Sequence, residues 1–139
     1  MGFLIDTCIW IDVEQGRLGP GDVASFTGDQ PVWLSPVTLA ELKLGIELAR
    51  DADVRQRRLA TYRRMTRKPL LVIDGATAEV FGDIAGYLAG KAGRFPRTRV
   101  QDVWLASQAI QHGLGFLTRN KRDFAMIPGL DLVCLGLTK

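Results

Sequence analysis

Soft metal ligands are scarce in this chain of 139 residues, which contains two cysteines and one histidine. Cys8 and Cys134 are far apart and lack Cys-x-x-Cys or Cys/His spacing. This pattern excludes a zinc knuckle and disfavours a disulfide framework, so we expect two reduced and mostly buried thiols. His112 falls in the last turn of a predicted helix, where a cation suits the helix dipole, and we assign it a structural role.

Long apolar runs are also absent. No stretch approaches the roughly 18 residues that crossing a bilayer requires, and the N-terminus lacks the charged lead and cleavage site of a signal peptide. We therefore expect a cytoplasmic protein without a membrane anchor. Hydrophobic residues make up 47% of the chain, as in globular proteins, and the length suits a single domain over residues 1–139.

The positive charge is unevenly distributed. The formal net charge is +3 and the isoelectric point is near 9.1, yet the stretch Arg55–Lys68 holds only cations among its charged residues. Further basic runs lie at Lys91–Arg99 and Arg119–Arg122. Clustered arginines of this kind indicate a polyanionic partner, nucleic acid above all. A solvated helix face explains Arg55–Lys68 equally well.

Short apolar runs alternate with helical patterns along the whole chain. The predicted strands are residues 3–5, 31–34, 70–73, 115–118 and 132–135. Between them, Ser35-Pro36 is a strong helix start, Asp74 is a second predicted cap, and residues 98–113 form a third helical pattern. The alternation predicts an α/β fold, a three-layer α/β/α sandwich around a parallel sheet of about five strands.

Three acidic residues occupy comparable places in this scheme. Asp6 ends the first strand, where open α/β sheets place their ligand crevice. Glu41 shares a helix face with the apolar residues Leu44 and Leu48, so its carboxylate requires a cation, a metal or a proton. Asp102 opens the helix over residues 98–113, which taken alone is an ordinary stabilising position.

Carboxylates that converge repel one another unless a cation neutralises them. Oxygen ligands without histidine or cysteine favour Mg²⁺ or Mn²⁺, ions that activate water in phosphodiester cleavage.

Four segments carry a more specific signal. They are FLIDTCIW around Asp6, SPVTLAELKLG around Glu41, QDVWLASQA around Asp102, and GFLTRNKRDF, which contains Thr118 and Asn120. In order, spacing and total length these segments resemble the PIN-domain ribonucleases, and within them the VapC-type toxins of bacterial toxin–antitoxin pairs.

The resemblance implies a parallel sheet with an acidic metal site at its carboxyl edge and Mg²⁺- or Mn²⁺-dependent endonucleolytic cleavage of RNA. Asp6 and Asp102 would bind the metal, Glu41 would bind the metal or its water, and the hydroxyls of Thr7 and Thr118 would support these ligands. The activity would inhibit translation and growth until a small antitoxin with a DNA-binding region covers the cleft. A homodimer bound to antitoxin is also implied.

The sequence departs from the family at its fourth acidic position, where many members have aspartate and this chain has Asn120. Either Asp123 takes that place, or Asn120 binds the ion or its water through the amide oxygen. Asp123 is equally typical of a turn or helix cap. The basic regions would bind RNA phosphate, and the predicted contacts are Arg57, Arg58, Arg64, Arg94, Arg97, Arg99 and Arg119.

Two other functions fit parts of the pattern. A non-catalytic RNA-binding or regulatory module on the same fold would explain Asn120 as the mark of a degraded site. A phosphoacceptor receiver domain would use Asp74, but the acidic pair and the lysine that such domains need are missing from the expected places.

Overall fold

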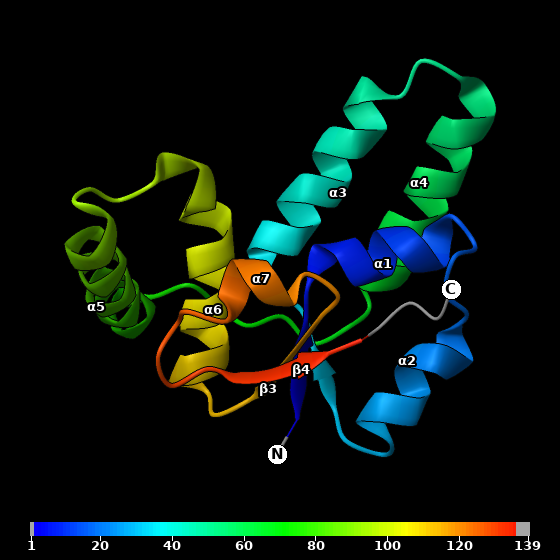
Figure 1. The fold of residues 1–139 in the computed structure, drawn as a ribbon. Helices are drawn as coiled ribbons and strands as arrows, with labels where there is room; N and C mark the ends of the chain where they lie inside the picture. Colours follow the sequence, from blue (N-terminus) through cyan, green and yellow to red (C-terminus); the bar gives the residue numbers. More distant parts are fainter. Residues whose placement is uncertain (1, 136–139) are drawn as a thin grey trace.

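A parallel sheet lies at the centre of the protein, in a computed structural model that describes residues 2–135 (Figure 1). Within these residues the sheet has four strands in the order β2-β1-β3-β4. The strands are β1 (Phe3–Ile5), β2 (Val32–Trp33), β3 (Gly115–Thr118) and β4 (Asp131–Cys134). Leu4 pairs with Trp33 of β2 on one side and with Phe116 of β3 on the other. Strand β1 is therefore central and has a neighbouring strand on each side.

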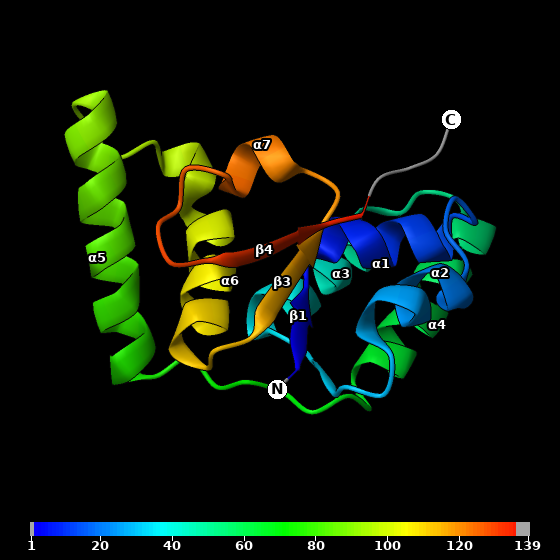
Figure 2. The same ribbon diagram turned by 60° about the horizontal axis from the view of Figure 1, so that its bottom comes forward.

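Helices cover both faces of the sheet, as the second view makes clear (Figure 2). One group lies on the side of α1 and contains α1 (Thr7–Glu14), α2 (Pro20–Thr27), α3 (Pro36–Leu48) and α4 (Ala52–Met65). The other contains α5 (Gly75–Ala92), α6 (Val100–Gln111) and the short α7 (Lys121–Phe124). The predicted α/β/α sandwich is therefore confirmed.

Two hydrophobic cores result from the alternation of side chains along the strands. Leu4 and Phe116 point to the α5/α6 side, where they join one buried cluster. Ile5 and Leu117 point to the α1/α4 side and join the other. Because both faces of β1 and β3 are buried, the strands consist of continuous apolar runs rather than alternating ones.

The predicted strand over residues 70–73 is wrong. Only Leu70 forms a bridge, to Leu34, through backbone bonds in which Leu34 donates to Pro69 and Leu71 donates to Leu34. Val72 is 67% exposed, because the chain leaves the sheet edge there to reach the start of α5. The apolar run predicted a buried strand, but Val72 is not packed against other residues as a buried strand would be. Within residues 2–135 the sheet has four strands instead of five.

The helix caps agree with the sequence. Ser35 accepts a hydrogen bond from the backbone N–H of Val37 at the start of α3. Asp74 and Thr77 form a capping box at the start of α5. Asp74 also accepts from Gln111 at 3.2 Å, so this carboxylate is a structural cap, which removes the support for a receiver-like site. Gly113 follows α6 with φ of 64°, a left-handed conformation that glycine adopts without strain.

Two predicted surfaces differ in the structure. Leu44 and Leu48 are 57% and 66% exposed, so the face of Glu41 is not buried along its length. The reason is that α3 runs past the sheet and packs on α4 as a projecting pair (Figure 1). Both cysteines are free, as expected, but Cys134 is exposed and Cys8 only partly buried.

None of the helices between residues 2 and 135 combines the length and the apolar character that crossing a membrane requires.

Candidate functional site

Asp6 lies where the end of β1 meets the start of α1. Its side chain is only 6% exposed, and its Oδ2 accepts a hydrogen bond from the Thr118 hydroxyl at 2.8 Å and one from the Cys8 thiol at 3.3 Å. Burial raises the pKa of Asp6, although these hydrogen bonds and those from the backbone of α1 oppose the shift. The carboxylate is held in place, but no basic side chain between residues 2 and 135 forms an ion pair with it.

Glu41 reaches the same region from the second turn of α3. The Thr7 hydroxyl lies 2.8 Å from Glu41 Oε1 and donates to it, and a second hydrogen bond of 2.9 Å joins Thr7 to the hydroxyl of Thr38. Burial raises the pKa of Glu41, and the charges of Asp6 and Asp102 raise it further. Thr7 thus fixes one carboxylate oxygen, as expected for a supporting hydroxyl.

Asp102 enters from the first turn of α6. Burial raises its pKa, the charge of Asp6 adds to this, and the guanidinium of Arg99 acts in the opposite direction. Arg99 belongs to a short 3₁₀ turn, η1 (Arg97–Arg99), just before α6, and its Nε donates to Asp102 Oδ2 at 3.2 Å. Arg99, one of the predicted RNA contacts, is thus the ion-pair partner of a predicted metal ligand rather than a free side chain in an extended arm.

The structure brings the three predicted acids together. Asp6 raises the pKa of both Glu41 and Asp102, and Asp102 raises that of Glu41, so each carboxylate lies within the electrostatic reach of the others. Within residues 2–135, however, no three His, Cys, Asp or Glu side chains are placed to hold an ion as they stand. Asp102 is turned to Arg99 instead. The oxygen-only donor set fits Mg²⁺ or Mn²⁺. To bind such an ion, the carboxylates of the three acids would have to move closer to one another.

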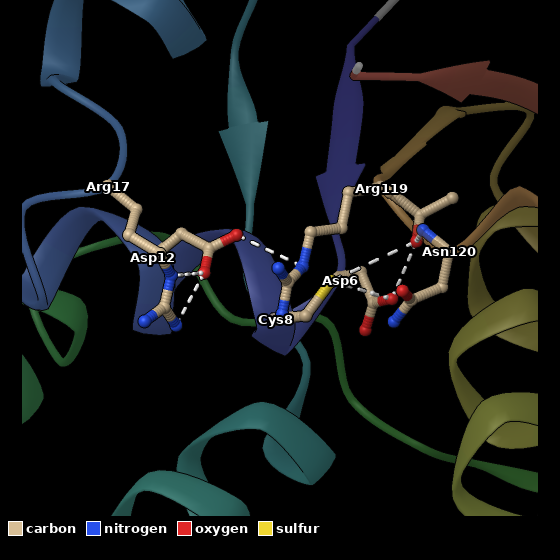
Figure 3. A network of polar contacts seen from close by, with 7 residues as sticks. Asp6, Cys8, Asp12, Arg17, Arg119 and Asn120 are labelled. Carbon is tan, nitrogen blue, oxygen red and sulfur yellow. Dashed lines mark hydrogen bonds and ion pairs between the residues drawn. The ribbon is translucent and has the colours of Figure 1, made fainter. Parts of the chain in front are cut away.

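Asn120 and Asp123 both border this cluster. The backbone N–H of Asn120 donates to the Thr118 hydroxyl at 3.0 Å, and that hydroxyl in turn holds Asp6 (Figure 3). The Asn120 side chain is exposed and does not cap α7. Asp123, in the first turn of α7, is near enough that its charge raises the pKa of Asp102. The chain therefore places the amide of Asn120 and the carboxylate of Asp123 near the three acids, where many family members have a fourth acid.

The arginines predicted to bind RNA divide into held and free side chains. Arg58 donates to the carbonyl of Gly45, and Arg64 donates to Thr61 Oγ1 at 3.3 Å. Arg57 and Arg64 also line a hollow between α1, α2 and α4. The side chains of Arg57, Arg94 and Arg97 are exposed. The expected basic loop is shorter than predicted, because α5 continues to Ala92.

Asp12 is a buried acid near the site that the sequence did not predict. Its side chain is fully buried in α1, where Arg17 contacts Oδ1 and Arg119 contacts Oδ2 (Figure 3). One signal was available: Asp12 lies one helical turn after buried Ile9, which places an acid on the buried face of the helix.

The comparisons with known proteins agree with this geometry. The chain matches the family described as PIN domain over residues 3–130. It is 32% identical to Ribonuclease VapC4 of Mycobacterium tuberculosis over 133 residues, which is 95% of each chain. It is 33% identical to Ribonuclease VapC5 of the same organism over 131 residues, covering 91% of this chain and 87% of the relative.

Solved structures give the same result. The fold is similar to the DNA-bound VapBC complex of Salmonella typhimurium, with a TM-score of 0.80, 26% identity and coverage of 97% and 98% of the two chains. The VapBC-5 toxin–antitoxin complex of Mycobacterium tuberculosis is similar with a TM-score of 0.72 and 26% identity, over 98% and 99% of the chains. With its sheet, its converging acids and these matches, the chain belongs to the PIN-domain family.

Proposed function

We propose that this protein is a Mg²⁺- or Mn²⁺-dependent endoribonuclease and the toxin of a toxin–antitoxin pair. The observation that carries the proposal is the convergence of Asp6, Glu41 and Asp102 from three separate elements, with raised pKa values and too few cations to balance them. Relatives named ribonucleases and neighbours solved as toxin–antitoxin complexes support it.

Asp6 and Asp102 are the residues that would hold the ion. When bound there, Mg²⁺ or Mn²⁺ would supply Lewis-acid stabilisation of the phosphodiester and acidify a water molecule. Thr118 keeps Asp6 in one orientation through Oδ2. Asp102 has to exchange its contact with Arg99 for the ion. Asn120 and Asp123 would complete the site on its fourth side.

Glu41 would position the attacking water and accept its proton. The Thr7 hydroxyl occupies Oε1, which leaves Oε2 to face the water. Burial, the largest cause of the raised pKa of Glu41, favours protonation of this carboxylate and so suits it to accept a proton.

An RNA-cleavage assay tests the catalytic proposal. Purified protein with Mn²⁺ should cut single-stranded RNA internally, and EDTA should stop the reaction. Asp6→Asn and Asp102→Asn should each lower the rate by at least about 100-fold. Glu79→Gln, which neutralises an exposed acid of α5, is the matched control and should cut normally.

Unchanged cleavage by both active-site variants would refute the proposal. If the wild type binds RNA with strong salt dependence but cuts none, the protein is the non-catalytic RNA-binding module instead.

The partner we propose is a small antitoxin that packs into the hollow between α1, α2 and α4. This hollow has a volume of 760 Å³, an apolar floor that includes Trp10, Val23 and Met65, and cations at its margin. A helix with an apolar face and flanking acids has the complementary chemistry. The neighbours solved as toxin–antitoxin complexes favour this occupant.

Filling the hollow tests this assignment. Ala24 is exposed and lines it, so Ala24→Arg should block copurification of the co-expressed antitoxin without slowing RNA cleavage. Ala78→Arg, at an exposed position of α5, is the control and should copurify normally. Retention of the antitoxin by Ala24→Arg would contradict the assignment.

Growth arrest in the cytoplasm, through inhibited translation, is the proposed physiological effect. Expression of the protein should stop incorporation of a labelled amino acid, and co-expression of the antitoxin should restore it. The homodimer expected from the sequence stays a prediction, which light scattering of the purified protein tests.

A further inference from the structure

Asp12 is a buried acid that the proposed reaction does not use. Its side chain is fully buried, and two arginines from different parts of the chain neutralise it. Arg17 Nε donates to Oδ1 at 2.8 Å, and Arg17 Nη2 lies at the same distance from that oxygen. Arg119 Nε lies 3.0 Å from Oδ2. The cluster therefore joins the end of α1 to the turn that follows β3.

The charges of this cluster do not cancel. Arg17 alone balances the charge of the Asp12 carboxylate, through two nitrogens on Oδ1. Arg119 lies at the other oxygen, Oδ2, which is buried and also needs a partner. With two arginines and one carboxylate, the cluster keeps one net positive charge.

The position of Arg119 suggests which anion that is. It lies between Thr118, whose hydroxyl holds Asp6, and Asn120, whose backbone binds the same hydroxyl. Figure 3 shows its guanidinium between Asp12 and Cys8, reached from the strand end that carries the acidic cluster. Among residues 2–135 the only polar contact of its side chain is Nε with Asp12. Both Nη groups are unused, and the side chain is 31% exposed.

The other arginines near the acids differ from Arg119. Arg99 is paired with Asp102, and Arg58 donates to the backbone of α3. Arg97 is exposed, and nothing described in the structure orients it. Arg119 has its Nε beside a buried carboxylate, in an ion pair, and its Nη groups have no partner among residues 2–135, so its planar guanidinium is placed to bind a phosphate.

We propose that Asp12 orients Arg119 as an anchor for an RNA backbone phosphate next to the one that the acidic cluster would cleave. This inference rests on the proposed ribonuclease function and adds to it one phosphate contact and one positioning residue. Arg119 touches the substrate, and Asp12 acts through Arg119. Arg17 neutralises Asp12 and makes no contact with RNA.

RNA binding without metal tests the anchor separately from cleavage. Fluorescence anisotropy of a labelled single-stranded RNA in EDTA gives the dissociation constant at several salt concentrations. Arg119→Gln should raise this constant about tenfold and reduce the salt slope by about 0.7, the value for one lost phosphate contact on a single strand. Arg17→Gln removes the other partner of Asp12 and should leave both quantities unchanged.

Two further variants test the positioning role. Arg119→Lys keeps the positive charge but loses the planar guanidinium that binds phosphate through two nitrogens. Compared with the wild type, it should show the same salt slope and a weaker affinity for RNA, intermediate between the wild type and Arg119→Gln. Asp12→Asn should weaken RNA binding at least about threefold while Mn²⁺ affinity, measured by calorimetry, stays unchanged. Circular dichroism selects folded samples, and Arg119→Gln alone decides the question if Asp12→Asn does not fold.

The outcomes separate this inference from the proposed function. If the wild type cleaves RNA and Arg119→Gln binds RNA normally, the anchor is refuted and the ribonuclease remains. If Arg119→Gln loses RNA binding and the wild type cuts nothing, the anchor stands and the ribonuclease is refuted. Equal weakening by Arg17→Gln and Arg119→Gln means a structural cluster only, and overturns the inference.

Discussion

Two buried acids at the two ends of α1 have opposite surroundings. Asp12 is fully buried and contacts two arginines. Asp6 is almost as buried, but within the described residues it receives only hydrogen bonds, from Thr118, Cys8 and the backbone. Glu41 and Asp102 add negative charge nearby. The charge of Asp12 is more than compensated, so this acid joins parts of the fold at no cost in repulsion, whereas the uncompensated cluster at Asp6 costs stability until a cation binds. The difference separates an acid that holds arginines in place from acids that are left to bind a metal.

The largest effect on stability is expected at Asp12. Asp12→Asn removes the charge that Arg17 and Arg119 share and leaves their guanidiniums beside a neutral amide. Breaking a buried pair in this way should lower the free energy of unfolding by about 3 kcal/mol. Urea denaturation of the metal-free protein measures it, with Asp83→Asn at an exposed position of α5 as control. A loss no larger than that of the control would show that the cluster is not balanced by these contacts.

Metal binding should stabilise the wild type by a similar amount. At 100 times the dissociation constant a ligand contributes about 2.7 kcal/mol, which corresponds to a rise in melting temperature of about 8 °C for a domain of this size. Differential scanning fluorimetry with Mn²⁺ measures the shift. It should disappear in Asp6→Asn and persist in Arg17→Gln, and an equal shift in both variants would place the ion elsewhere.

A mutation at Asp6 should raise the stability of the metal-free protein, whereas the mutation at Asp12 lowers it. Asp6→Asn relieves repulsion and removes a buried charge, so it should raise the stability of the metal-free protein by about 1 kcal/mol at pH 7.

The pH dependence has a definite sign. Since the folded pKa values of Asp6, Glu41 and Asp102 are raised, the folded state binds their protons more tightly. Their contribution to stability is complete below the ordinary pKa values and is lost as pH rises through the raised ones. The slope should be smaller in Asp6→Asn, and a clear loss of stability in that variant at pH 7 would contradict repulsion.

The smallest effect is expected at Arg99, which is paired with one acid of the cluster, Asp102. Arg99→Gln frees Asp102 from its ion pair and should tighten Mn²⁺ binding about threefold, since a partly exposed ion pair contributes less than about 1 kcal/mol. Calorimetry measures it, and Arg97→Gln is the matched control from the same turn. Weaker Mn²⁺ binding in Arg99→Gln would show that Arg99 supports the site rather than competing for it.

The sequence predicted the parts of this account that depend on local patterns. Periodicity and helix chemistry predict three such features: the strand Phe3–Ile5 before Asp6, the helix cap at Ser35, and the position of Asp102 in the first turn of its helix. The resemblance of the four segments then related these acids to one another, and the structure brings them together.

What could not be predicted depends on packing between distant segments. Residues 70–73 have the composition of a strand, but the chain leaves the edge of the sheet after Leu70, so Val72 stays exposed. The local sequence does not show where the sheet ends. Leu44 and Leu48 look like core residues until α3 is seen to project with α4. The pairing of Asp12 with Arg119 joins residues more than 100 positions apart, and no local pattern relates them.

Anomalous scattering from crystals grown with Mn²⁺ tests the central claim most directly. The account predicts a manganese peak between the carboxylates of Asp6 and Asp102, with Arg99 turned away and no peak at Asp12. An empty acidic cluster, or a peak at a site away from Asp6, would contradict it.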